Sequence, residues 1–153
     1  MPTRTSNQLF PATDLKPRSR VLVLGVGGAG CNAVARMAAE WQEGPPVAGL
    51  NTDAQALAAC GLSRTLLLGE KATGGLGAAG DINAGRLAAE ESLAAIQDLM
   101  AGTDLLVLVG GLGGGTATGA FPVIAKAARD LGILTMAFIS LPFSFEGDRK
   151  RRL

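Results

Sequence analysis

The hydrophobic residues of this chain form two alternating patterns, short continuous aliphatic runs and longer segments with helical spacing. Continuous runs are typical of strands that are covered on both faces, and they occupy residues 20–25, 46–51, 64–69, 104–110 and 133–141. Helical spacing predicts helices at residues 31–41, 53–60, 86–100 and 120–132. Because strands alternate with helices, we predict a doubly wound, Rossmann-like α/β fold with a parallel sheet.

A glycine-rich turn joins the first predicted strand to the first predicted helix. Its sequence, GVGGAG, has the spacing G-x-G-x-x-G at Gly25, Gly27 and Gly30. In dinucleotide-binding proteins this spacing lets the backbone and the helix N-terminus approach a phosphate. Asp53 follows about 20 residues later, where an NAD enzyme holds its ribose hydroxyls, and it also suits the N-cap of the next helix. The motif alone leaves a second interpretation open, a tight turn that serves only the packing of strand against helix.

A second glycine-rich loop, GGLGGGTATG at residues 110–119, follows the fourth predicted strand. In a doubly wound sheet the loops after the first and fourth strands flank the same crevice. Backbone N–H groups from two such loops, with the hydroxyls of Thr116 and Thr118, form a cradle that suits a chain of phosphates. A third glycine-rich run, residues 69–85, lies at the same edge, and the P-loop sequence G-x-x-x-x-G-K-[ST] is absent. The sequence therefore predicts a polyphosphate ligand.

Composition narrows the possible functions. A length of 153 residues, 48% of them hydrophobic, suits one domain with its own core. The near balance of 14 Lys and Arg against 13 Asp and Glu argues against nucleic-acid binding. The sequence has no histidine, which excludes a histidine base and histidine-ligated zinc. Cys31 and Cys60 fit no metal or redox spacing, so we expect both to be buried. Residues 1–19 predict a flexible leader, and no segment is apolar enough for direct membrane insertion.

Five stretches together resemble the nucleotide-binding half of the FtsZ family, the tubulin-like GTPases of bacterial cell division. They are GVGGAGCNAV, NTDAQAL, LGEKATGGLGAAGDINAGRLAAEES, GGLGGGTATGAFPVIAK and LPFSFEG, and the resemblance spans residues 21–147. Residues 113–119 resemble the tubulin signature G-G-G-T-G-T-G, which is highly specific. The resemblance implies GTP or GDP with Mg²⁺ as ligands and self-association into filaments. It also implies division-ring proteins as partners and a cytoplasmic location at the division site in midcell.

The resemblance assigns nucleotide-binding roles to individual residues. Gly27 and Gly28 would contact phosphates. The loop that senses the γ-phosphate would consist of Ala78, Ala79 and Gly80. The main phosphate cradle would consist of Gly114, Gly115, Thr116 and Ala117. Asn32 would contact guanine and ribose, Asp53 would lie near the γ-phosphate and Mg²⁺, and Glu146 would bind the ribose. The family's nucleotide-contacting arginine corresponds to Lys150 or, with the match shifted by one position, to Arg151. The alternatives are an ordinary helix residue for Asn32, a surface charge for Glu146 and a solvated basic helix face for Lys150.

The chain also departs from the family pattern. Ala117 replaces the glycine between the two signature threonines and Ala79 takes a usual glycine position, which costs about 1–2 kcal/mol only where φ is positive. In the family a downstream acidic loop completes hydrolysis on the nucleotide of the adjacent subunit, so we assign no catalytic residue and leave enzyme activity open. We expect residues 20–153 to form a GTP-binding domain truncated before the core helix and the second domain. The alternatives are a divergent, non-hydrolysing FtsZ-like filament protein and an NAD-type Rossmann domain.

Overall fold

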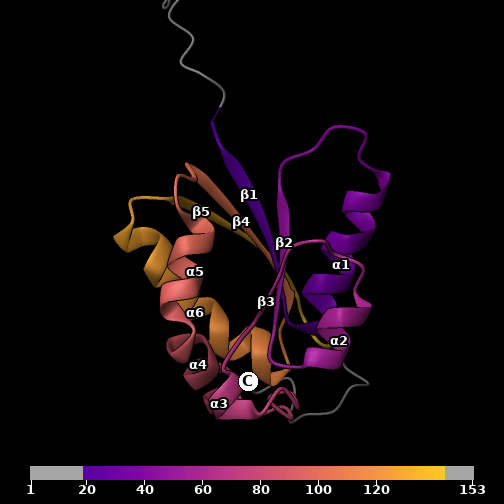
Figure 1. Ribbon diagram of the computed structural model, residues 1–153, viewed down its shortest axis with the longest axis vertical. Helices are drawn as coiled ribbons and strands as arrows, with labels where there is room; N and C mark the ends of the chain where they lie inside the picture. The colour runs from indigo at the N-terminus through magenta and orange to yellow at the C-terminus, as the bar shows by residue number, and fades with distance from the viewer. Residues whose placement is uncertain (1–18, 144–153) are drawn as a thin grey trace, which may run out of the picture.

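The computed structural model describes residues 19–143, which form a five-stranded parallel sheet covered by helices (Figure 1). In sheet order the strands are β3 (Thr65–Leu67), β2 (Val47–Asn51), β1 (Val21–Val26), β4 (Leu105–Gly111) and β5 (Leu134–Ser140). All neighbouring strands are parallel and β4 pairs with β1, so the predicted fold class and strand positions are confirmed. The predicted leader, apart from Ser19, and the candidate residues Glu146, Lys150 and Arg151 lie outside the described residues.

Helices cover both faces of the sheet, as the doubly wound fold requires. The helices α1 (Gly27–Glu40) and α2 (Ala54–Ala59) lie on one face. On the other face lie α4 (Ile82–Glu91), α5 (Leu93–Met100) and α6 (Gly115–Asp130), with the short α3 (Glu70–Thr73) beside α4 (Figure 1). The predicted N-cap at Asp53 is confirmed, because its Oδ1 accepts a hydrogen bond from the N–H of Ala56 at 2.9 Å.

The largest hydrophobic cluster lies between the sheet and the helices α4 to α6. Leu24, Leu50 and Leu106 contribute to it from the three central strands, and Ile96 and Ile124 contribute from α5 and α6. All five side chains are fully buried, and each contributes about 1.5–3 kcal/mol through the apolar surface it removes from water. The central strands are therefore fixed firmly, and the loops at their carboxyl ends start from a rigid base.

Three predicted helix starts are several residues too late, and one of these three predicted helices is two helices. The helix α1 begins at Gly27 and α6 at Gly115, inside stretches that glycine content favours as loops. The segment predicted as one helix at 86–100 begins at Ile82 and is divided at Ser92. The Ser92 hydroxyl accepts a hydrogen bond from the N–H of Gly69 at 2.9 Å, so it serves the loop after β3. That loop also contains α3, which the hydrophobic pattern does not predict.

Glycines allow α4 and α6 to pack backbone against backbone. A Cβ atom on Gly85 of α4 would collide with the carbonyl oxygen of Gly115, and one on Gly119 of α6 would collide with that of Ile82. Part of the glycine enrichment in this region therefore serves helix packing. The close contact brings the start of α4, and the loop before it, against the first turn of α6.

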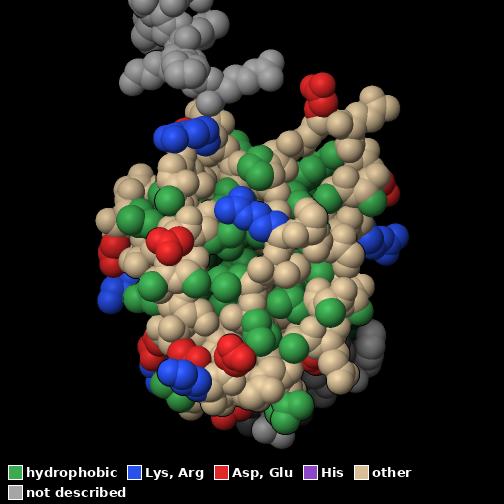
Figure 2. Space-filling model, viewed as in Figure 1, with side chains coloured by type: hydrophobic (Ala, Val, Ile, Leu, Met, Phe, Trp, Pro, Cys, Tyr) green, Lys and Arg blue, Asp and Glu red, His purple; other side chains and the backbone are tan. Residues whose placement is uncertain are grey.

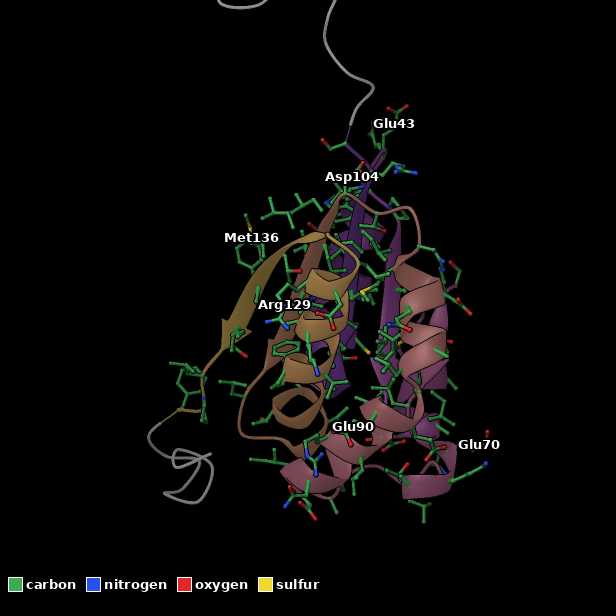
Figure 3. All side chains as sticks on the ribbon, turned by 90° about the vertical axis from the view of Figure 1, so that its left-hand side faces the viewer. Glu43, Glu70, Glu90, Asp104, Arg129 and Met136 are labelled. Atoms are coloured by element: carbon green, nitrogen blue, oxygen red, sulfur yellow. The ribbon has the colours of Figure 1, made fainter. Side chains whose placement is uncertain are left out.

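The surface of the described part of the molecule has two further features. Charged side chains of both signs are scattered over the face shown in Figure 2. On β5, the side chains of Leu134, Met136 and Phe138 are 49% to 70% exposed, and Figure 3 shows Met136 pointing away from α6. No helix within residues 19–143 combines the length and apolar character needed to cross a membrane.

Candidate functional site

A cleft of about 520 Å³ opens at the carboxyl ends of the central strands. Val26, Gly111 and Ser140, the last residues of β1, β4 and β5, contribute to its walls. Within the described part of the chain, the lining consists of residues 26–29, 80, 111–117 and 140–143. From β1 the chain continues to β2 on one side, and from β4 it continues to β5 on the other. Open α/β sheets bind their ligands at the point between two such strands.

Two helices begin at this cleft without a side-chain cap. The N-cap residues are Val26 for α1 and Gly114 for α6, and neither side chain forms a capping hydrogen bond. The first turn of a helix has N–H groups without intrahelical partners and carries a partial positive charge. Neither first turn contains an acidic residue, and no charged side chain is among the lining residues described above. The cleft therefore presents two sets of N–H donors, an arrangement suited to phosphates.

Glycines of the first turn and of the second glycine-rich loop fall into two groups, according to whether an added Cβ atom would collide with neighbouring atoms. A Cβ atom on Gly25 would lie 2.5 Å from the carbonyl oxygen of Gly30, and one on Gly30 would collide with that of Val109. Nothing lies within 4 Å of the corresponding position on Gly28 or Gly114. Gly25 and Gly30 therefore serve packing, whereas Gly28 and Gly114 leave open space beside the cleft. The packing interpretation of the G-x-G-x-x-G motif therefore holds for Gly25 and Gly30. Gly27, the remaining glycine of the motif, lines the cleft, and its contact with a phosphate stays a prediction.

The loop formed by residues 74–80 reaches the edge of the cleft at Gly80. Four of its glycines have φ between 60° and 88°, so the loop depends on left-handed backbone conformations. It is held by the segment after β2, because the N–H of Ala54 bonds the carbonyl oxygen of Gly75 at 2.9 Å and the N–H of Gly77 bonds that of Thr52 at 3.0 Å. Ala78 is buried against Gly115. The third glycine-rich segment thus lies beside the second, as the sequence predicts.

We expect Ala79→Gly to stabilise the protein by about 1 kcal/mol. Ala79 is the one described non-glycine residue with positive φ, at 47°, and this conformation costs an L-residue about 1–2 kcal/mol, part of which glycine loses again through its greater freedom in the unfolded chain. Urea unfolding measures the difference. Gly80→Ala is the matched control, because Gly80 has φ of 77° and open space around it, so this change should destabilise by a similar amount. A loss of stability in Ala79→Gly would contradict the prediction.

We expect Ala117→Gly to lower the stability of the protein, whereas Ala79→Gly should raise it. Ala117 lies inside α6 with ordinary helical φ and is only 4% exposed, so glycine should destabilise by roughly 0.5–1 kcal/mol. Because the alanine does not distort the backbone, we expect no tighter nucleotide binding. Ala125→Gly, in the same helix but away from the cleft, controls for the loss of helix propensity. Nucleotide affinity is measured by calorimetric titration. Tighter nucleotide binding by Ala117→Gly, but not by Ala125→Gly, would contradict the prediction.

Four sequence-predicted site residues within 19–143 are not among the residues that line the cleft: Asn32, Asp53, and the pair Ala78 and Ala79, which directly precedes Gly80. Asn32 lies in an exposed groove with Arg36 and Cys60, between α1 and the end of α2. Asp53 is half-buried and caps α2. Within residues 19–143 no group of three potential ligands could hold a metal ion by itself, so Mg²⁺ would need phosphate oxygens as further ligands. The nucleotide-binding roles assigned to these residues, like those of the other candidate site residues, stay predictions.

The cysteines differ in their environments. Burial raises the pKa of the Cys31 thiol to about 12, and its Sγ donates to the carbonyl oxygens of Gly25 at 3.4 Å and Leu50 at 3.5 Å. This side chain is a packing element at the base of the first turn, as expected. Cys60 is only half-buried, so the expectation for it is wrong. It caps the short α2, whose end lies at the surface.

Sequence reasoning misses several residues at or behind the cleft. Ser140 and Phe143 line it at the end of β5. Thr52 is fully buried behind it, with its Oγ1 2.6 Å from Oγ1 of Thr116. The available signal is the N-T-D triplet that begins with the last residue of β2, because this strand neighbours β1 and ends at the same edge of the sheet.

Comparisons with known proteins agree with this geometry. The family model of the Tubulin/FtsZ family, GTPase domain, matches residues 20–153. "Cell division protein FtsZ 2" of Rhizobium meliloti is 48% identical over 138 residues, which are 90% of this chain and 39% of that protein. An empty FtsZ dimer from M. jannaschii matches with a TM-score of 0.84 and 40% identity, over 88% of this chain and 39% of the other. CetZ2 from Haloferax volcanii, in a GTPγS-bound protofilament, matches with a TM-score of 0.72 and 25% identity, over 86% and 42%. The chain thus spans well under half the length of these relatives.

Proposed function

This chain belongs to the Tubulin/FtsZ family, and from that membership we propose that it is the GTP-binding part of an FtsZ-like GTPase that forms filaments for the bacterial division ring. The observation that carries the proposal is the cleft at the carboxyl ends of β1 and β4. There the uncapped N-termini of α1 and α6 open, and none of the lining residues within 19–143 has a charged side chain. Backbone donors of this kind suit a ligand with several adjacent phosphates.

Different segments of the described chain would contact different parts of the nucleotide. Gly27 and Gly28 on one side, and Gly114 to Ala117 on the other, would hold the phosphates through backbone N–H groups. The loop 74–80 would lie near the terminal phosphate, because Gly80 lines the same cleft. Mg²⁺ would be held chiefly by phosphate oxygens, with the carboxylate of Asp53 expected near it by resemblance, and it would neutralise charge on the phosphates.

Filament formation and the division ring are proposed from the relatives. The proposed role in division is based on the similarity to the cell division protein of R. meliloti. The proposed self-association is based on the similarity to the M. jannaschii dimer and the H. volcanii protofilament. We propose that the protein acts in the cytoplasm at midcell, in filaments of its own kind together with other division-ring proteins.

Calorimetric titration with GTP, GDP and NAD tests the ligand. We expect GTP and GDP to bind in the presence of Mg²⁺ and NAD not to bind. The NAD-type reading of the first turn uses only one glycine loop, whereas this cleft is built from two. Binding of NAD without binding of GTP would refute the proposed function.

A further inference from the structure

Thr52 is a buried polar residue between the two glycine-rich walls of the cleft. Its side chain is 0% exposed, and its Oγ1 lies 2.6 Å from Oγ1 of Thr116 in the first turn of α6. Its carbonyl oxygen accepts hydrogen bonds from the N–H of Gly77 at 3.0 Å and from the hydroxyl of Thr73 at 3.3 Å. Its own N–H donates to Oδ1 of Asn51 at 2.9 Å. The backbone of Thr52 is therefore fixed on both sides, and so is the position of its hydroxyl.

The direction of the bond between the two threonine hydroxyls follows from counting protons. Each hydroxyl has one proton to donate and lone pairs to accept. If Thr116 donated to Thr52, the proton of the buried Thr52 hydroxyl would need another acceptor, and this hydroxyl makes no other hydrogen bond within residues 19–143. A buried donor without an acceptor is costly. Thr52 is therefore the donor and Thr116 the acceptor.

The consequence concerns the proton of Thr116. Thr116 is half-buried and lines the cleft, so its hydroxyl proton is free to point toward a ligand once its oxygen accepts from Thr52. We propose that Thr52 is a positioning residue that fixes the Thr116 hydroxyl as a hydrogen-bond donor to a phosphate oxygen of the bound nucleotide. The inference rests on the proposed function, because it needs an anionic ligand in this cleft. It assigns Thr52 no contact with the ligand itself.

The test is a double-mutant cycle in GTP affinity, measured by calorimetry on the 153-residue chain. Thr52→Val keeps the shape of the side chain but removes the donor, and we expect it to weaken GTP binding by about tenfold. Thr52→Ser restores a donor and should recover most of that affinity. Thr116→Val should weaken binding by itself, and Thr52→Val should then cause no further loss, because both changes remove one interaction. A residue that only fills space would show neither the rescue by serine nor the non-additivity.

Each outcome of this experiment is decisive. Equal affinities of folded Thr52→Val and the unaltered protein, equal losses in the valine and serine variants, or additive losses in the double variant would each overturn the inference. If Thr52→Val does not unfold cooperatively, Thr52→Ala removes the same donor without a new methyl group, and the same results are required of it. Failure of the unaltered protein to bind GTP would overturn the proposed function as well. GTP binding that Gly114→Asp abolishes but Thr52→Val leaves intact would overturn this inference alone.

Discussion

Gly114→Asp is expected to weaken GTP binding at least a hundredfold while the protein stays folded. Gly114 has φ of −101° and ψ of 160°, which any residue adopts, and nothing lies within 4 Å of the place that its Cβ would take. The fold therefore accepts a side chain there. An aspartate would point its carboxylate at the phosphates, and like charges side by side cost several kcal/mol, equivalent to a loss of two or more orders of magnitude in affinity.

The position of Gly114 makes a second part of this result testable. It is the N-cap of α6, and aspartate is among the preferred N-cap residues because its carboxylate accepts hydrogen bonds from the N–H groups of the first turn. The substitution should therefore leave the free energy of unfolding unchanged or raise it by a few tenths of a kcal/mol. The carboxylate would take up the same N–H groups that we assign to the phosphates. Stability and affinity should thus change independently.

Two neighbouring variants serve as controls for Gly114→Asp. Gly114→Ala adds a Cβ atom in open space without a charge, so GTP affinity should stay within a few-fold of that of the unaltered protein. Gly115→Ala should instead lower stability, because its Cβ atom would lie 2.6 Å from the carbonyl oxygen and 2.8 Å from the N atom of Asp81. Unchanged GTP affinity in a folded Gly114→Asp variant would remove the basis for the phosphate assignment.

The strands and the edge of the sheet at which the cleft opens are predictable from the sequence, whereas the helix starts are not. The five aliphatic runs become the five strands, because a strand covered on both faces needs apolar residues throughout. Glycines at 27, 28 and 115 argue locally against a helix. The structure begins α1 and α6 there, since close packing of backbones offsets the weak helix propensity. That packing joins residues far apart in the chain, such as Gly85 and Gly115, and no local pattern contains it.

The same limit applies to the site. The resemblance predicts Gly28 and Gly114 as site residues, and both line the cleft. The spacing does not separate them from Gly25 and Gly30, because only the neighbours in space decide which glycine serves packing. The proposed role of Thr52 cannot be predicted from the sequence for a similar reason. Its partner Thr116 is 64 residues away, and its importance depends on the order of strands in the sheet, which places the end of β2 beside the cleft.

The second large effect is expected in catalysis: the 153-residue chain alone should bind GTP yet release phosphate no faster than GTP in buffer. Phosphoryl transfer requires a water molecule held in line with the terminal phosphate and charge balance around it. Asp53, which pairs with Leu76 of the loop 74–80 through an isolated β-bridge, and Asp81, which directly follows Gly80, each use one carboxylate oxygen as an N-cap. These oxygens lie 2.9 Å from the N atom of Ala56 and 2.8 Å from that of Asn83. No carboxylate is among the described residues that line the cleft, and the chain has no histidine.

We therefore propose that the water is oriented by acidic groups of an adjacent subunit, so that filament contact completes the site. Phosphate release measured at rising protein concentration tests this, with GTP binding measured on the same samples to show that the nucleotide is present. Asp53→Asn and Asp81→Asn are the matched variants, because each keeps an N-cap oxygen while removing the charge. If either carboxylate were the catalytic base, the unaltered chain would hydrolyse GTP and that variant would not. Turnover that is robust and independent of protein concentration would show that one chain contains the complete machinery, and the shared site would have to be abandoned.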